Sequence, residues 1–188
     1  MSSNNGKVRI DEQDSAIRLE NEHFTLVIEK HNGFITHYEV DGNKMIDRPL
    51  RWNFWRPPTL NDLVDRNGAR AWDGLDKLQS SCLSVQTRKV KADNTPIQAE
   101  VELTLALDAP DGQHMELQEV VGVDGEGNLQ LDFVLTPNGS FRSLPKMGIQ
   151  LALDSSFRNC EFEGNLLESY PDRRTAQQWG TWVKTMQE

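Results

Sequence analysis

Two short stretches of the chain concentrate residue types that recognise sugars or join domains. The first, RWNFWRPPTLND at residues 51–62, places two tryptophans, a phenylalanine, two arginines and two prolines in twelve positions. Indole rings stack on the apolar faces of sugars, and a nearby arginine or carboxylate can hydrogen-bond the hydroxyls. In a strand, Trp52 and Phe54 would share one face as core residues, whereas Trp55 would look outward with Arg56. The alternative is a Trp–Arg stack that only packs the protein.

The second stretch is ESYPDRR at residues 168–174. Its Tyr-Pro pair fixes a turn, and Asp172 and Arg173 can form a bidentate ion pair there or reach other segments. The alternative is a local salt bridge in an exposed loop, which contributes little to stability.

Catalytic patterns are weak elsewhere in the chain. The four histidines are scattered without the spacing of metal ligands, and neither a nucleophile elbow nor a phosphate-binding glycine loop is present. The chain has 29 acidic residues, so counting alone does not decide whether two of them form a glycosidase pair.

The elements that must position these residues are predicted to be strands. Period-two alternation recurs along the chain, and turns rich in Gly and Asn separate the segments. The predicted strands are residues 16–20, 24–30, 34–40, 82–90, 99–107, 114–123, 129–137, 147–153 and 160–164. This rhythm predicts an all-β protein, an antiparallel sandwich or barrel. Only residues 57–78 break it, and connections of that length are usually functional or disordered.

Composition narrows the classes of partner. The net charge of −9 argues against nucleic acid, because phosphate binding requires clustered Lys and Arg. No apolar run is long enough to span a membrane, and the first residues do not resemble a signal peptide, so we expect a cytoplasmic location without membrane association. Cys82 and Cys160 are expected to be free thiols.

Three segments, in order and at similar spacing, resemble a known family. NFWRPPTLND resembles a motif near the start of the last domain of bacterial β-galactosidases of glycoside hydrolase family 2. LPKMGIQLAL resembles the strand that follows in those proteins, and EGNLLESYPDRRTAQQWG resembles their segment after it. The resemblance, to the β-galactosidase small chain or C-terminal domain (domain 5), covers nearly the whole chain from about Ile17.

The resemblance implies an antiparallel supersandwich of the galactose-mutarotase-like group. It places the catalytic glutamates in a separate barrel domain or large subunit, so that this chain alone would be inactive and would partly wall the galactose site. The implied partners are that catalytic part and a galactoside such as lactose, and the Mg and Na that the family commonly uses would sit in other domains. The residues expected at the wall or at the domain interface are Trp55, Arg56, Asn61, Asp62, Glu168, Tyr170, Asp172 and Arg173.

The resemblance also sets expected boundaries. Residues 1–15 are expected to be disordered or flexible, and residues 16–188 to form the N-terminal two-thirds of the family's domain. An incomplete sandwich exposes an unpaired edge and apolar area, so we expect self-association, with residues 175–185 as the exposed strand. Leu60 departs from the family motif, since it stands where an acidic loop residue is expected.

Two functions from other classes remain as alternatives. A stand-alone aldose-epimerase-like enzyme would need a histidine and a glutamate facing each other across a cleft, and only His37 and His114 lie in predicted strands. A free carbohydrate-binding module would bind sugar through Trp55.

Overall fold

The chain forms two compact units, which are described separately. The computed structural model describes residues 6–64, 72–91, 94–137, 144–165 and 179–185. The first unit comprises Met1–Ala152 and the second Leu153–Glu188.

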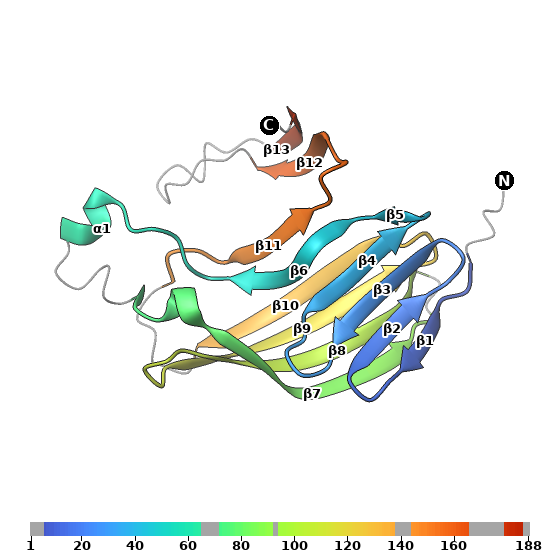
Figure 1. Cartoon of the computed structure of the whole chain (residues 1–188), viewed down its shortest axis with the longest axis horizontal. Coiled ribbons are helices and arrows are strands. Elements are labelled where there is room, and N and C mark those ends of the chain that lie inside the picture. Colours follow the sequence, from blue (N-terminus) through green and yellow to red (C-terminus); the bar gives the residue numbers. More distant parts are fainter. Residues whose placement is uncertain (1–5, 65–71, 92–93, 138–143, 166–178, 186–188) are drawn as a thin grey trace. The chain divides into compact units, whose positions relative to one another are not determined.

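The first unit contains two sheets, which Figure 1 shows as two layers. The larger sheet has the order β1-β2-β3-β4-β6-β11, and β5 pairs with β4. Its strands are β1 (Arg9–Glu12), β2 (Ala16–Glu20), β3 (Phe24–Glu29), β4 (Ile35–Val40), β5 (Asn43–Lys44), β6 (Ile46–Asn53) and β11 (Gly148–Leu153).

The smaller sheet is an antiparallel meander in the order β10-β9-β8-β7. Its strands are β7 (Gln79–Lys89), β8 (Ile97–Asp108), β9 (His114–Asp124) and β10 (Leu129–Pro137). The segment between the two sheets contains the short helix α1 (Leu60–Val64) and the 3-10 helix η2 (Leu75–Lys77).

The inner faces of the two sheets form the hydrophobic core. In β8 every second residue from Ile97 to Leu107 is buried, and β3 alternates in the same way from Phe24 to Ile28. Successive side chains of a strand point to opposite faces, so each strand contributes one apolar row to the core and one polar row to the surface. The same alternation that predicted the strands therefore gives each sheet the apolar face that packs against the other sheet.

Hydrogen bonds between the two sheets help to fix their alignment, which apolar packing alone does not specify. Ser80 Oγ donates a hydrogen bond to the carbonyl oxygen of Asn32 at 2.7 Å, and the Tyr38 hydroxyl donates to the carbonyl oxygen of Gly127. These bonds join β7 to the turn after β3, and β4 to the turn before β10. Hydrogen bonds require a specific geometry, so they restrict sliding of one sheet over the other.

The second unit contains an antiparallel hairpin of β12 (Asn159–Asn165) and β13 (Trp179–Thr185). Trp179 lies 67% exposed, and its Nε1 donates to Glu163 Oε1 at 2.8 Å. Trp182 is half-buried and donates from Nε1 to the Gly164 carbonyl oxygen at 3.2 Å. Part of the segment expected to be an exposed strand is therefore a strand, with one of its two tryptophans largely in solvent.

The predicted all-β antiparallel sandwich is confirmed, and each of the nine predicted strands is present within a few residues of its predicted bounds. Within residues 1–15, which are expected from the sequence to be disordered or flexible, residues 9–12 form a strand. These residues form β1, which pairs with β2, and the neighbouring Val8 is buried in the core. The short, charged sequence RIDE hides this strand from an alternation test, although Arg9 forms an ion pair with Glu20 across the pairing.

The two sheets approach each other closely at the turn between β3 and β4, and this approach can be tested there. Gly33 has a φ of +75°, and an added Cβ would lie 2.6 Å from Leu105 Cδ2 on the facing sheet. We expect Gly33→Ala to lower the free energy of unfolding by about 2–5 kcal/mol, as the sum of left-handed strain and overpacking. Urea-induced unfolding measures the loss.

Gly42→Ala is the matched control, because Gly42 has the same φ of +75° but no atom within 4 Å of the added Cβ. We expect it to cost only the strain, about 1–2 kcal/mol. Equal losses for the two variants would show that the sheets do not approach closely at Gly33.

Candidate functional site

The aromatic stretch begins at the end of β6 and continues past it. Phe54 is 2% exposed, which confirms its predicted place in the core. Trp52 and Trp55 are both half-buried and pack against the core, so Trp52 is less enclosed and Trp55 more enclosed than predicted. β6 ends at Asn53, whose Oδ1 accepts the backbone N–H of Trp55 at 3.0 Å. The chain turns there, so strand alternation no longer decides the direction of the Trp55 side chain.

Arg56 and Asp62 form a bidentate ion pair that closes the following loop. Arg56 Nη1 lies 2.7 Å from Asp62 Oδ2, and Nη2 lies 3.3 Å from Oδ1. Asp62 Oδ2 also accepts hydrogen bonds from the backbone N–H and the hydroxyl of Thr59, at 2.6 and 2.7 Å. This arrangement resembles a capping box at the start of α1. The bonds from Arg56, and then those from Thr59, hold the pKa of Asp62 well below its ordinary value.

The guanidinium of Arg56 also lies over an aromatic ring from the next segment. Its Cζ is 4.8 Å from the centroid of Trp72, within the range of a cation–π contact. The alternative left open by the sequence was a Trp–Arg stack within residues 51–62; in the structure Arg56 stacks on Trp72, which lies outside that stretch. Arg56 therefore joins the residues after β6 to the segment that precedes η2.

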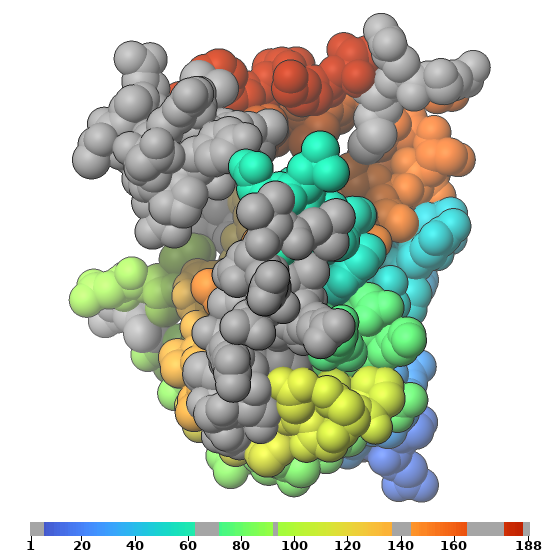
Figure 2. Space-filling view, turned by 90° about the vertical axis from the view of Figure 1, so that its left-hand side faces the viewer, coloured from blue at the N-terminus to red at the C-terminus, as the bar shows by residue number. Residues whose placement is uncertain are grey.

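These residues line a cavity of about 490 Å³ in the first unit. Trp52, Asn53, Phe54, Trp55 and Arg56 contribute to its wall, as do residues of η2, β7, β8 and β11. A smaller cavity of about 380 Å³ shares Trp55 and Asp76 with it. Figure 2 shows the segment after β6 in teal, and the residues around η2 in green beside the turn between β8 and β9 in yellow.

The larger cavity differs in charge from the chain as a whole. Three cationic side chains line it, those of Arg51, Arg56 and Lys146, against one described carboxylate, Asp76. The chain as a whole carries a net charge of −9. Aromatic faces beside fixed hydrogen-bond donors suit a polar ligand with hydroxyl or anionic groups, or a polar surface of a neighbouring domain.

A buried carboxyl group lies behind this wall. Glu119 in β9 is 3% exposed, and its Oε2 accepts a hydrogen bond from Trp52 Nε1 at 3.0 Å. Burial raises the pKa of Glu119 from 4.5 to about 7, although the bond from Trp52 opposes the rise. Desolvation disfavours the charged form, and one neutral donor only partly compensates.

The structure brings together three of the eight predicted site residues. Trp55, Arg56 and Asp62 lie around the end of β6, whereas Asn61 is exposed on α1. Glu168, Tyr170, Asp172 and Arg173 lie outside the described residues. Leu60, the residue that departs from the family motif, is also exposed, with 81% of its surface accessible to solvent.

Sequence reasoning missed four residues of this region: Trp72, Asp76, Lys146 and Glu119. Trp72 and Asp76 fall in the stretch without alternation, and their aromatic and acidic types are the signal that could have selected them. Glu119 is an acid at an inward-facing position of β9, between Leu117 and Val121. A charged residue in an apolar row is visible in the sequence once the register is known.

Other chemistry has less support among the described residues. No group of three or more His, Cys, Asp or Glu side chains there is placed to hold a metal ion. His37 Nε2 lies 3.9 Å from Glu39 Oε2 on β4, and neither His37 nor His114 lines the larger cavity. Within the described parts of the chain, no helix has the length and hydropathy of a membrane span.

Comparison with known proteins matches residues 20–188 to the family described as the β-galactosidase small chain. The chain is similar to the β-galactosidase of Pseudoalteromonas haloplanktis, with 24% identity over 96% of this chain and 18% of that protein. It is also 24% identical to the β-galactosidase of Yersinia enterocolitica, over 98% of this chain and 18% of that protein. The chain thus spans less than a fifth of the length of these curated relatives.

The buried carboxyl makes folding stability depend on pH. Between about pH 4.5 and 7 the unfolded chain loses the Glu119 proton before the folded chain does, so stability falls as pH rises through this window. We expect Glu119→Gln to remove this fall, which amounts to about 3 kcal/mol at most. The measurement is the free energy of unfolding from urea titrations at several pH values.

Glu116→Gln is the control for this prediction. Glu116 lies on the same strand with its side chain on the opposite face, where it is only half-buried. This variant should keep the pH dependence of the wild type. A wild type and a Glu119→Gln variant with parallel stability curves from pH 4.5 to 7 would mean that the carboxyl is not desolvated.

Proposed function

The chain belongs to the β-galactosidase small chain family, and from this premise we propose that it is the non-catalytic sandwich portion of a β-galactosidase. In this role it walls one side of the galactose site and helps to hold the enzyme's assembly. Its partner is the catalytic barrel domain or large subunit, and the substrate of the assembly is a terminal β-D-galactoside such as lactose. Self-association of the chain through its exposed apolar side chains belongs to the same proposal.

One observation carries this proposal: the family motif that distinguishes the sequence is also the part of the first unit that lines the cavity. Trp55 and Arg56 lie in the wall, and the ion pair with Asp62 fixes the loop that follows. An aromatic ring beside fixed polar groups is the composition of a sugar-binding wall.

The catalytic acids are better placed in the other part of the enzyme. Glycoside hydrolysis usually requires two carboxyl groups on opposite sides of the scissile bond. The larger cavity has one carboxylate among its described lining residues, Asp76, and three cations. The charge of this wall suits contact with hydroxyl groups or with acidic residues of a partner better than it suits acid–base catalysis.

We therefore expect the purified 188-residue chain to have no glycosidase activity. The assay uses an aryl β-galactoside at high protein concentration, after removal of host enzyme. Asp73 and Asp76 both line the smaller cavity, so they are the acids to test first if turnover is seen. Turnover that persists through purification and disappears in Asp76→Asn would contradict a non-catalytic role.

In the full β-galactosidase that contains this chain, we expect Arg56→Ala to lower kcat/KM by about tenfold or to loosen assembly. The variant removes the ion pair to Asp62 and the contact with Trp72, so the wall loses its shape while the catalytic acids are untouched. Enzyme kinetics and size-exclusion chromatography measure the two effects.

Arg88→Ala is the matched control, because Arg88 also forms ion pairs, with Glu100 and Glu102, but on the outer face of the smaller sheet. It should leave kcat/KM unchanged. If Arg56→Ala unfolds the isolated chain but leaves kcat/KM of the full enzyme at the wild-type value, Arg56 is a packing residue. The cavity wall that contains it would then not border the galactose site.

A further inference from the structure

Glu119 differs from the other buried acid among the described residues. Asp124 is 5% exposed at the end of β9, where its carboxylate accepts bonds from the backbone N–H groups of Glu126 and Asn128. Such bonds close a local turn. Glu119 instead lies within the strand, and its hydrogen bond comes from a side chain of the opposite sheet.

The surroundings of Glu119 are apolar. Its neighbours in register are Leu103 on β8 and Phe133 on β10, and Leu117 and Val121 are the inward-facing residues on its own strand. None of these side chains titrates. Among the described residues only burial and the bond from Trp52 shift its pKa. An apolar residue would avoid the desolvation cost at this position, so stability alone does not explain a carboxyl group there.

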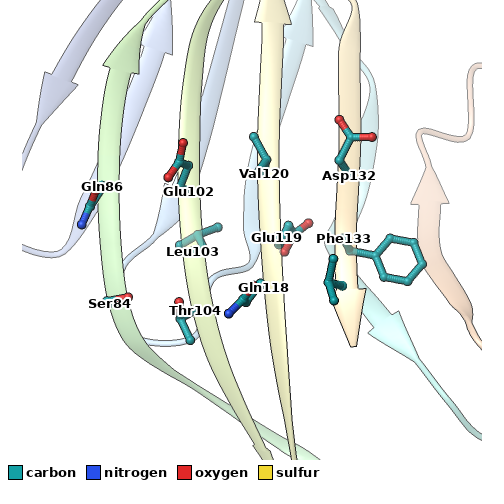
Figure 3. Close-up of a pocket in the computed structure, with 11 residues that line it drawn as sticks. Ser84, Gln86, Glu102, Leu103, Thr104, Gln118, Glu119, Val120, Asp132 and Phe133 are labelled. Carbon is teal, nitrogen blue, oxygen red and sulfur yellow. The ribbon is translucent and has the colours of Figure 1, made fainter. Parts of the chain in front are cut away.

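Glu119 also lies too deep to act as a general acid. A trough of about 360 Å³ runs over the outer face of the smaller sheet, and Figure 3 shows its residues. Gln118 and Val120 point to that face, so the side chain of Glu119 between them points to the core. Glu119 is among the residues that line the trough, but it is only 3% exposed, so its carboxyl group is nearly closed off from a substrate lying there.

The Glu119 carboxyl group contacts Trp52, which is one of the residues that line the larger cavity. The Trp52 ring also packs on Phe133, with ring centroids 4.3 Å apart at an interplanar angle of 54°. The hydrophobic effect has no preferred direction, whereas a hydrogen bond to Nε1 favours a narrow range of ring orientations. The next residue, Asn53, accepts a hydrogen bond from the backbone N–H of Trp55. The orientation of Trp52 therefore affects where Asn53 and Trp55 lie in the cavity wall.

We propose that Glu119 is a positioning residue, which fixes the orientation of Trp52 across the sandwich and thereby the placement of Asn53–Arg56 in the cavity wall. It acts through Trp52 and touches no ligand. The link to substrate turnover rests on the proposed function, but the positioning itself does not.

The test uses the 188-residue chain labelled with ¹⁵N, and it follows the indole N–H of Trp52 and the backbone N–H of Trp55. Glu119→Leu removes the acceptor and suits an apolar site. We expect exchange of the Trp52 indole proton with solvent to become about tenfold faster, and the Trp55 and Arg56 signals to shift, without a loss of global stability. Glu119→Gln keeps an acceptor oxygen and should restore wild-type exchange.

Two further measurements keep the proposal falsifiable if Glu119→Leu does not fold. In the wild type, the Trp52 indole signal should titrate with an apparent pKa near 7, and it should not do so in Glu119→Gln. Trp52→Phe removes the donor and should shift the same Trp55 and Arg56 signals. A Trp52 signal that ignores pH, or wall signals that move no more than in the Glu116→Gln control, would overturn the proposal.

Kinetics of the full enzyme separate this proposal from the proposed function. Glu119→Leu should lower kcat/KM severalfold, and Glu119→Gln should restore it. Altered Trp52 exchange with unchanged kcat/KM would support the positioning role and count against the wall role of the cavity. Unaltered exchange would overturn the positioning role whatever the kinetics.

Discussion

The first unit depends on the burial of two apolar sheet faces against each other, because neither face can remain in water. Each strand supplies one row of inward side chains, and burial of about 25 cal/mol per Å² of apolar area drives the rows together. The force has no direction, so it brings the layers into contact but does not fix their alignment. Alignment comes from the few places where shape or hydrogen bonding is specific, such as Gly33 against Leu105 and Ser80 against Asn32.

The carboxyl group of Glu119 uses that apolar layer in a different way. Water is excluded there, so a single hydrogen bond from Trp52 is strong and directional, and the same exclusion raises the pKa of the acid. The cost in stability and the gain in orientation thus have one physical origin. Within the aromatic stretch, Trp52 is thus held by a residue of the opposite sheet, whereas Trp55 is held by its neighbour Asn53.

The loop after β6 is organised by charge instead of burial. Arg56 is held by Asp62 on one side and by the ring of Trp72 on the other. Its side chain is 36% exposed, so the pair contributes more to the shape of the loop than to the stability of the fold. Such a loop can present its polar groups to a ligand or to a neighbouring domain, which is the role proposed for it in a β-galactosidase.

The sequence by itself determined the all-β class, most strands and the family, since alternation and local motifs are encoded within a few adjacent residues. It did not reveal β6 as a strand or β1 as part of the sheet, because Pro49 and the charged RIDE segment obscure their alternation. Only the tertiary structure decided that Arg56 stacks on Trp72 and that Trp52 meets Glu119, which is 67 residues away. Such contacts depend on how two sheets align, and no local pattern records that alignment.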